Sequence, residues 1–293
     1  MDFPGMDLPQ MDLPAGKRVA LSIVVNVEEG SEMSVARGDA GMEPVDELAV
    51  FIKGPLRNYG NESNYRYGIN AGAPRVLALL AEHGVPASWT VAAQALEQCP
   101  DLARAIVSLG HEPVSHGLRW VHQFKMDEAE ERAFIRGAAE SIERTTGIRP
   151  RGWLSRYMLT DNTRRLLIEE GFAYHMDDYS NDIPFWDRDT VAGSPIVVMP
   201  YQVDTNDMKM WVSQSYTPRQ WLEYAIDALD HMRAEGTPGR GGMMSLGLHL
   251  RIIGRPGRFW ALAKFMEHVA ACDDVWIATR GQIRDRFAQQ VPA

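Results

Sequence analysis

The chain has 293 residues, 45% hydrophobic and 24% charged, which is an ordinary globular composition with enough apolar side chains for a sizeable core. The formal net charge is −9 and Lys/Arg-rich runs are absent, which argues against nucleic acid or an anionic membrane as the main partner. Cys99 and Cys272 stand far apart in no metal-type spacing, and the sequence shows no signal-peptide pattern or membrane-length apolar run. We therefore expect a cytoplasmic protein.

Residues 1–16 repeat a short unit, "MDFPG", "MDLPQ" and "MDLPAG". Proline recurs about every five residues, which is too often for a helix. Two interpretations are open: an extended or disordered tail, or an arm that lays Phe3, Leu8 and Leu13 onto a neighbouring subunit. We treat residues 1–16 as an arm and residues 17–290 as a single catalytic domain.

The rest of the chain alternates between strand and helix patterns. The run "VALSIVVNV" (19–27) is almost continuously apolar and β-branched, as in a strand that is buried on both faces. Further strands are predicted at 87–91, 111–116, 151–155, 172–177, 196–200, 243–250 and 275–279. Helices are predicted at 73–84, 100–110, 126–147, 161–171, 217–236, 256–271 and 281–288.

Seven or eight apolar strands that alternate with helices indicate one α/β domain with a parallel sheet. No Gly-rich dinucleotide or phosphate loop follows the first strand. We therefore predict a (β/α) barrel rather than an open sheet.

Polar side chains stand at or just after the carboxyl ends of six of the predicted strands. They are Asn26, Glu28 and Glu29; His116; Arg156; Asp177 and Asp178; Asp204, Asn206 and Asp207; and His249 and Arg251. In a barrel, the active site is built at the carboxyl ends of the strands. Together these residues predict a polar cleft, whereas any one of them alone could be a helix cap or a surface charge.

The cleft residues permit two kinds of hydrolysis. In the first, Glu28, His116 and a third ligand hold a metal ion that activates water. In the second, a carboxylate or imidazole takes a proton from water, and another group protonates the leaving nitrogen. The fourth residue after His116 is Trp120, which cannot bind a metal, and His122 is six residues away. This spacing gives little support for a metal.

Several motifs resemble the polysaccharide deacetylases that carry the NodB homology domain, over roughly residues 17–290. The counterparts are "NVEEG", "SHGLRW", Arg156 and "LGLHLR" with His249. The resemblance implies a distorted (β/α) barrel around a divalent metal. The chain departs from the pattern at two of the three metal positions, with Glu28 in place of an aspartate and Trp120 in place of the second histidine.

The chain is similar to a branch that holds metal-independent allantoinases of the PuuE type and cyclic amide or imide hydrolases. The motifs that carry this similarity are "NVEEG", "GHEPVSHGLRW", "NTRRL", "VDTNDM" and, most specific of all, "GLHLRIIGRPGR" (247–258). Members of that branch are often tetrameric, so a homo-oligomer is expected. The segment "LSRYMLTDN" (154–162) differs from what is expected of true allantoinases, which leaves the ring that is opened undetermined.

We therefore predict a hydrolase that opens a small cyclic amide, imide or ureide and requires no cofactor. Glu28 and His116 would orient and deprotonate water, and His249 would protonate the departing nitrogen. Four residues are predicted to bind the substrate: Trp120 as a flat wall, Arg156 as a carbonyl or carboxylate clamp, and Asp204 and Asn206 as readers of the ring. Arg156 and main-chain donors would also hold the developing oxyanion.

Two alternatives remain. One is a metal-dependent N-deacetylase of an amino sugar polymer, with Zn²⁺ or another divalent cation held by Glu28, His116 and His122. The other is a non-catalytic protein that binds a small metabolite. The histidines at 83, 231 and 268 fall within amphipathic helices and are expected to be structural.

Overall fold

A nine-stranded sheet forms the centre of the protein, in the order β10-β2-β3-β4-β5-β6-β8-β7, with β11 also paired to β2. The computed structural model describes residues 7–212 and 215–293. The strands are β2 (Val19–Val27), β3 (Ser88–Val91), β4 (Glu112–Ser115), β5 (Gly152–Trp153), β6 (Tyr174–His175), β7 (Phe185–Asp187), β8 (Ile196–Val198), β10 (Met243–His249) and β11 (Val275–Ile277). All ladders are parallel except the one between β7 and β8.

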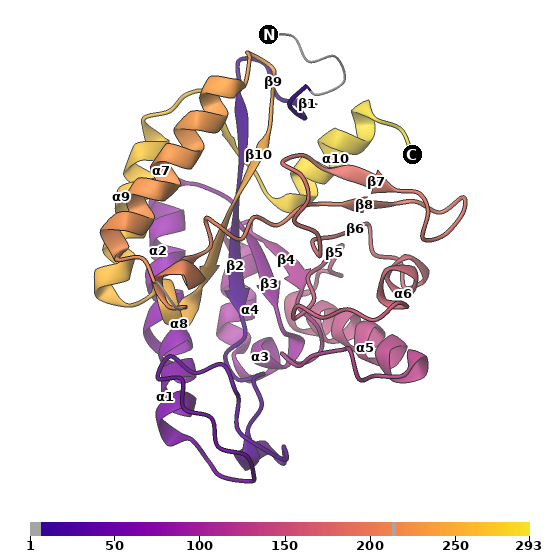
Figure 1. Ribbon diagram of the computed structural model, residues 1–293, viewed down its shortest axis with the longest axis vertical. Coiled ribbons are helices and arrows are strands. Elements are labelled where there is room, and N and C mark those ends of the chain that lie inside the picture. Colours follow the sequence, from indigo (N-terminus) through magenta and orange to yellow (C-terminus); the bar gives the residue numbers. More distant parts are fainter. Residues whose placement is uncertain (1–6, 213–214) are drawn as a thin grey trace.

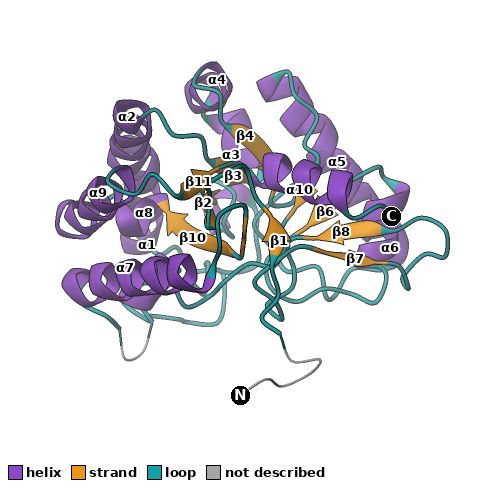
Figure 2. Cartoon of the chain, turned by 90° about the horizontal axis from the view of Figure 1, so that it is seen from above, coloured by secondary structure: helices purple, strands orange, loops and turns teal. Residues whose placement is uncertain are grey.

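The sheet curls into a partial barrel, as the view from above shows (Figure 2). Strands β10 and β7 are its two ends, and within the described residues no ladder joins them. The predicted distorted (β/α) barrel with seven or eight parallel strands is confirmed. The antiparallel β7 was not expected, because it only overlaps the end of the polar segment 177–186 and has three residues.

Helices cover the outer face of the sheet, with α7, α9 and α2 on one side and α5 and α6 on the other (Figure 1). Their bounds are α1 (Tyr59–Tyr67), α2 (Ala73–His83), α3 (Ala93–Gln98), α4 (Pro100–Ser108), α5 (Glu128–Thr146), α6 (Thr163–Glu169), α7 (Pro218–Glu235), α8 (Leu250–Ile253), α9 (Pro256–Ala270) and α10 (Arg280–Gln290). Asp127, Thr217 and Thr279 begin three of them with capping boxes that satisfy free backbone N–H groups. Within the described residues, no helix is long and apolar enough to cross a membrane.

All the predicted helices are present, and three more were not predicted. Helix α1 contains Asn, Gly and Tyr, which are weak helix formers, and it leads directly into a π-helix at Gly68–Gly72. Helix α3 has six residues, and α8 continues the apolar run of β10 for four residues. Local pattern alone does not mark such short helices.

The N-terminal arm packs partly on its own chain. Strand β1 (Met11–Asp12) pairs with β9 (Arg240–Gly241), and Met11 and Leu13 are buried in the core. Leu8 is exposed, and Phe3 lies outside the described residues. Leu13 is therefore already covered within its own chain, whereas Leu8 is free to make the contact that the second interpretation requires.

Candidate active site

A pocket of about 230 Å³ opens at the carboxyl ends of the strands. Its wall is built from Asn26 of β2, from residues that follow β2, β4, β5, β6 and β8, and from the last residue of β10. Six of the predicted site residues line it: Glu28, His116, Trp120, Arg156, Asn206 and His249. The register of the sheet brings two of the contributing strands together, because His249 is the direct neighbour of Asn26 in the β10–β2 ladder.

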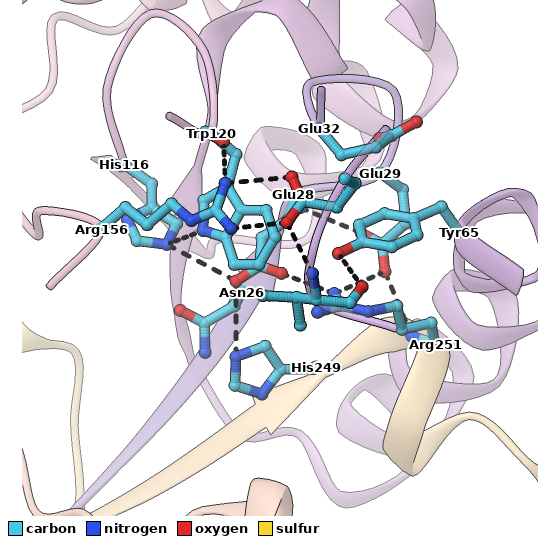
Figure 3. A network of polar contacts seen from close by, with 12 residues as sticks. Asn26, Glu28, Glu29, Glu32, Tyr65, His116, Trp120, Arg156, His249 and Arg251 are labelled. Carbon is cyan, nitrogen blue, oxygen red and sulfur yellow. Dashed lines mark hydrogen bonds and ion pairs between the residues drawn. The ribbon is translucent and has the colours of Figure 1, made fainter. Parts of the chain in front are cut away.

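Glu28 lies at the centre of the polar network in Figure 3. Its Oε1 is 3.6 Å from His116 Nε2 and 3.4 Å from His249 Nε2, and its Oε2 is 2.5 Å from Arg251 Nη1. Burial by itself would raise the pKa of Glu28, but the charge of Arg251, followed by that of His249, lowers this pKa well below its ordinary value. Glu28 is therefore ionised at neutral pH although it is buried.

Arg251 is the cation that permits this burial. It follows β10 in α8, and its side chain is almost fully buried with the guanidinium carbon 4.3 Å from the ring centre of Tyr65 and 5.3 Å from that of Trp120. Its backbone N–H donates to Glu29 Oε1. The sequence places Arg251 at a strand end, but the pattern assigned it no role.

His249 is held by a carboxylate that was also not among the predicted site residues. Asp207 accepts hydrogen bonds from the backbone N–H and from Nδ1 of His249, both at 2.7 Å. Burial lowers the pKa of His249, but the charges of Asp207 and Glu28 outweigh it and raise this pKa to about 9. The imidazole is therefore protonated at neutral pH, with Nε2–H directed at Glu28.

The His249–Asp207 pair leads to a testable dependence of kcat/KM on pH. We expect the kcat/KM of the wild type to fall on the alkaline side near pH 9, where His249 loses its proton. Asp207→Asn removes the largest contribution that raises this pKa, so the alkaline limb should move at least about one pH unit lower. A pH–rate profile of both proteins measures the shift, and an unchanged limb would show that another group carries it.

His116 has a single tautomer consistent with its neighbours. Its Nδ1 is 2.7 Å from the carbonyl oxygen of Leu154, which can only accept, so Nδ1 carries the hydrogen. The indole N–H of Trp120 donates to Nε2 at 3.1 Å. The imidazole is therefore neutral, and its one free lone pair already has a partner.

Trp120 is pressed into the pocket wall by Arg156, whose guanidinium carbon lies 3.7 Å from its ring centre. The same guanidinium makes two hydrogen bonds to Glu43, at 2.5 and 3.0 Å, and one to the carbonyl of Trp120 at 2.6 Å. Glu43 comes from the long excursion after β2, in which no sequence motif marks it. Three of the five N–H donors of Arg156 thus hold the wall, and among the remaining ones Nε is buried without a partner in the described residues.

Comparison with known proteins shows which family this chain is part of. A Schizosaccharomyces pombe protein named as a polysaccharide deacetylase is 34% identical over 95% of this chain and 93% of its own length. The sequence profile of the polysaccharide deacetylase family matches residues 63–174. This chain belongs to the polysaccharide deacetylase family.

Solved structures also superpose over nearly the whole chain. The crystal structure of PuuE allantoinase matches with a TM-score of 0.93 at 37% identity and covers all of both chains. A structure from Pseudomonas aeruginosa PAO1, named as a polysaccharide deacetylase, matches with a TM-score of 0.90 at 39% identity over 95% of this chain and 93% of the other. The chain is accordingly a hydrolase of carbon–nitrogen bonds other than peptide bonds.

Two predicted site residues of this deacetylase-family chain lie elsewhere. Asp204 is not in the pocket wall, because its carboxylate accepts a hydrogen bond from the Tyr224 hydroxyl of α7. His122 Nδ1 is 3.1 Å from the carbonyl of Arg156, and its ring lies beside those of Phe124 and Tyr157. The prediction of Asp204 as a ring reader is not supported by its position.

Asp177 lies just outside the pocket wall. Its Oδ1 accepts the backbone N–H of Ser155, and burial raises its pKa to about 6. Since Ser155 lines the pocket, Asp177 supports the wall from behind rather than facing a bound molecule.

Proposed function

We propose that this chain opens a small cyclic amide, imide or ureide by adding water to a ring carbonyl, without a metal ion. The observation that carries the proposal is the surroundings of Glu28. The carboxylate has a fixed guanidinium on one oxygen and a protonated imidazole near the other. A base and an acid are thus both in place, with a permanent positive charge beside them.

The donor set around Glu28 does not fit a divalent cation. Metal binding by His116 needs a free Nε2 lone pair, and Trp120 donates into that lone pair. Glu28 Oε2 already has Arg251 Nη1 at 2.5 Å, and a second cation there would be repelled. Glu28, His116 and His122 are not among the groups of side chains in the described residues whose ligand atoms lie close enough together for an ion.

The reaction begins when Glu28 takes a proton from water, and the oxygen of that water attacks the ring carbonyl carbon. The electrons of the C=O bond move to its oxygen and give a tetrahedral intermediate. As the carbonyl reforms, the C–N bond breaks, and His249 Nε2 gives its proton to the departing nitrogen. His116 borders the water site, but it cannot take a proton at Nε2 unless the Trp120 contact breaks.

The low pKa of Glu28 makes it a weak base in the resting enzyme, so the proton it takes from water is held weakly until His249 has given up its own proton. The charge of His249 is one of the two main causes of that low pKa. When His249 transfers its proton to nitrogen, this charge disappears, and the proton affinity of Glu28 rises. The two residues therefore act as a coupled pair, in which loss of a proton at one favours retention at the other.

The outer part of the pocket favours a ring with a non-polar substituent. Tyr157, Tyr179, Val203 and Val212 line it and are between 43% and 57% exposed, so each offers apolar surface to a bound molecule. Tyr157 has φ 56°, a strained left-handed conformation that persists where surrounding structure imposes it. It lies in the segment 154–162, which is expected from the sequence to differ from true allantoinases.

A substrate panel tests the proposal. We expect turnover of unsubstituted succinimide and hydantoin, and a kcat/KM about ten-fold higher for phenyl- or isobutyl-substituted rings than for the bare rings. Activity should be unchanged in a chelator. Allantoin, with its polar ureido arm, should be a poorer substrate than the phenyl-substituted hydantoin.

Metal analysis of the purified protein is the experiment that could contradict the proposal. Because Asp230, His268 and Cys272 form a group on the outer helices that could hold an ion, the analysis should use Cys272→Ser as well as the wild type. Zinc at one equivalent in that variant, with chelator-sensitive release of acetate from N-acetylglucosamine oligomers, would contradict the proposal and support the metal-dependent deacetylase.

A further inference from the structure

Tyr201 lies in the pocket wall with its hydroxyl between two asparagine side chains. Its oxygen is 3.2 Å from Asn26 Nδ2 and 3.1 Å from Asn206 Nδ2. The residue is buried, and it follows β8. Two amide groups directed at one hydroxyl hold it in a fixed orientation, which a residue that only lines the wall does not require.

The orientation of both amides is determined by other partners. Asn26 Nδ2 also donates to the carbonyl of Leu248 at 3.0 Å, so this atom is the nitrogen. Asn206 Oδ1 accepts the backbone N–H of Met208 at 2.8 Å, so its other atom is the nitrogen. Both amides therefore donate to the Tyr201 oxygen, and neither can accept from it.

A phenol hydroxyl accepts through two lone pairs and donates one hydrogen. The two asparagines use both lone pairs of Tyr201. The hydrogen then has to point elsewhere, and the structure gives it no acceptor among the described residues. An unpaired buried O–H costs free energy, so a polar group in the pocket is its natural partner.

We propose that the Tyr201 hydroxyl donates a hydrogen bond to the substrate carbonyl oxygen and stabilises the negative charge that develops there during attack. This rests on the proposed function and adds an oxyanion donor beside Arg156, three of whose five N–H donors are engaged elsewhere. The two asparagine amides polarise the hydroxyl and hold it in one orientation before substrate arrives, which is how such donors act most strongly. Burial raises the pKa of Tyr201 above its ordinary value, so the hydrogen stays in place at any working pH.

Gly247 of β10 makes room for this arrangement. A Cβ at this position would overlap the Tyr201 hydroxyl and would lie 2.7 Å from Asn206 Nδ2. Any larger side chain would therefore displace the hydroxyl and the amide together. The glycine of "GLHLR" is thus explained by the space that the hydroxyl occupies.

The test is Tyr201→Phe, which removes one oxygen and keeps the ring. We expect kcat for ring opening to fall about 10²–10³-fold, with KM changed by only a few-fold. Tyr174→Phe is the matched control, because Tyr174 is also fully buried, donates its hydroxyl to Glu112 at 2.9 Å, and lies outside the pocket. The control should lose stability but keep its kcat.

A thiocarbonyl substrate separates a catalytic from a structural role. Sulfur accepts hydrogen bonds weakly, so the wild type should be slowed when C=O becomes C=S, and Tyr201→Phe should be slowed much less. Equal slowing of both proteins, or a Tyr201→Phe variant with full kcat, would overturn the role of the hydroxyl while leaving ring opening intact. Failure of the wild type to open any cyclic amide would overturn both proposals.

Discussion

Glu28→Gln should lower kcat for ring opening by about 10³–10⁴-fold, because the amide oxygen cannot take the proton of the attacking water. The amide keeps the shape of the side chain, so substrate affinity should change little. Steady-state kinetics on the best ring of the substrate panel measures the loss. The thermal unfolding of the variant should be measured together with its kinetics, because the substitution also leaves the buried Arg251 without its charged partner.

Glu29→Gln is the matched control for this loss. Glu29 is the adjacent buried carboxyl group, and it accepts the backbone N–H groups of Glu28 and Arg251 without lining the pocket. Burial raises its pKa to about 7, so it is partly protonated near neutral pH. The amide keeps the size of the side chain and one of its two acceptor atoms. We expect at most a few-fold change in kcat. Losses of similar size in both variants would mean that the carboxyl pair acts through packing, not through proton transfer.

Arg251→Met should destabilise the fold by about 3–5 kcal/mol, since it leaves the buried carboxylate of Glu28 without its main counter-charge. The effect should depend on pH with a definite sign. In the wild type the folded-state pKa of Glu28 is lowered, so its contribution to stability is present above its unfolded value near 4.5 and is lost as the pH falls. In the variant, burial should raise the folded pKa, so stability should instead decline as the pH rises from acid to neutral.

Urea unfolding of both proteins across that pH range measures the change of slope. Arg280→Met is the control, because Arg280 is also fully buried but donates to backbone carbonyls and Ser245, not to a carboxylate. It should be destabilised without a comparable reversal in pH dependence. If Arg251→Met kept the wild-type slope, His249 alone would be sufficient to hold Glu28 ionised.

Much of the fold was predictable because its signals are local. The nine-residue run that forms β2 is buried along its whole length, as its continuous apolar pattern predicts. Proline, glycine and capping residues mark the ends of α5 and α7 within one or two residues. The short elements α8 and β7 escaped prediction, because three or four residues carry no detectable period.

The candidate site was predictable in part for a related reason. Parallel strands bring their carboxyl ends to one edge, so Glu28, His116 and His249 could be grouped from their positions after three strands. Asp204 and Asn206 show the limit of this argument. They are two residues apart in one turn, yet Asn206 lines the pocket and Asp204 bonds to α7. Strand ends indicate which loop reaches the site but not which side chain of that loop faces it.

The amino-acid sequence alone predicts a curled parallel sheet with titratable groups at one edge. It also places Trp120 where a metal-binding histidine was expected. These features depend on periodicity and short spacings, which a linear chain displays directly. The tertiary structure alone decided the electrostatics: Arg251 meets Glu28 across 223 positions of sequence, and Arg156 meets Glu43 across 113. Charges and lone pairs acquire their partners only when distant segments pack, so the ionisation of Glu28, the proton on His249 and the free hydrogen of Tyr201 are properties of the folded chain.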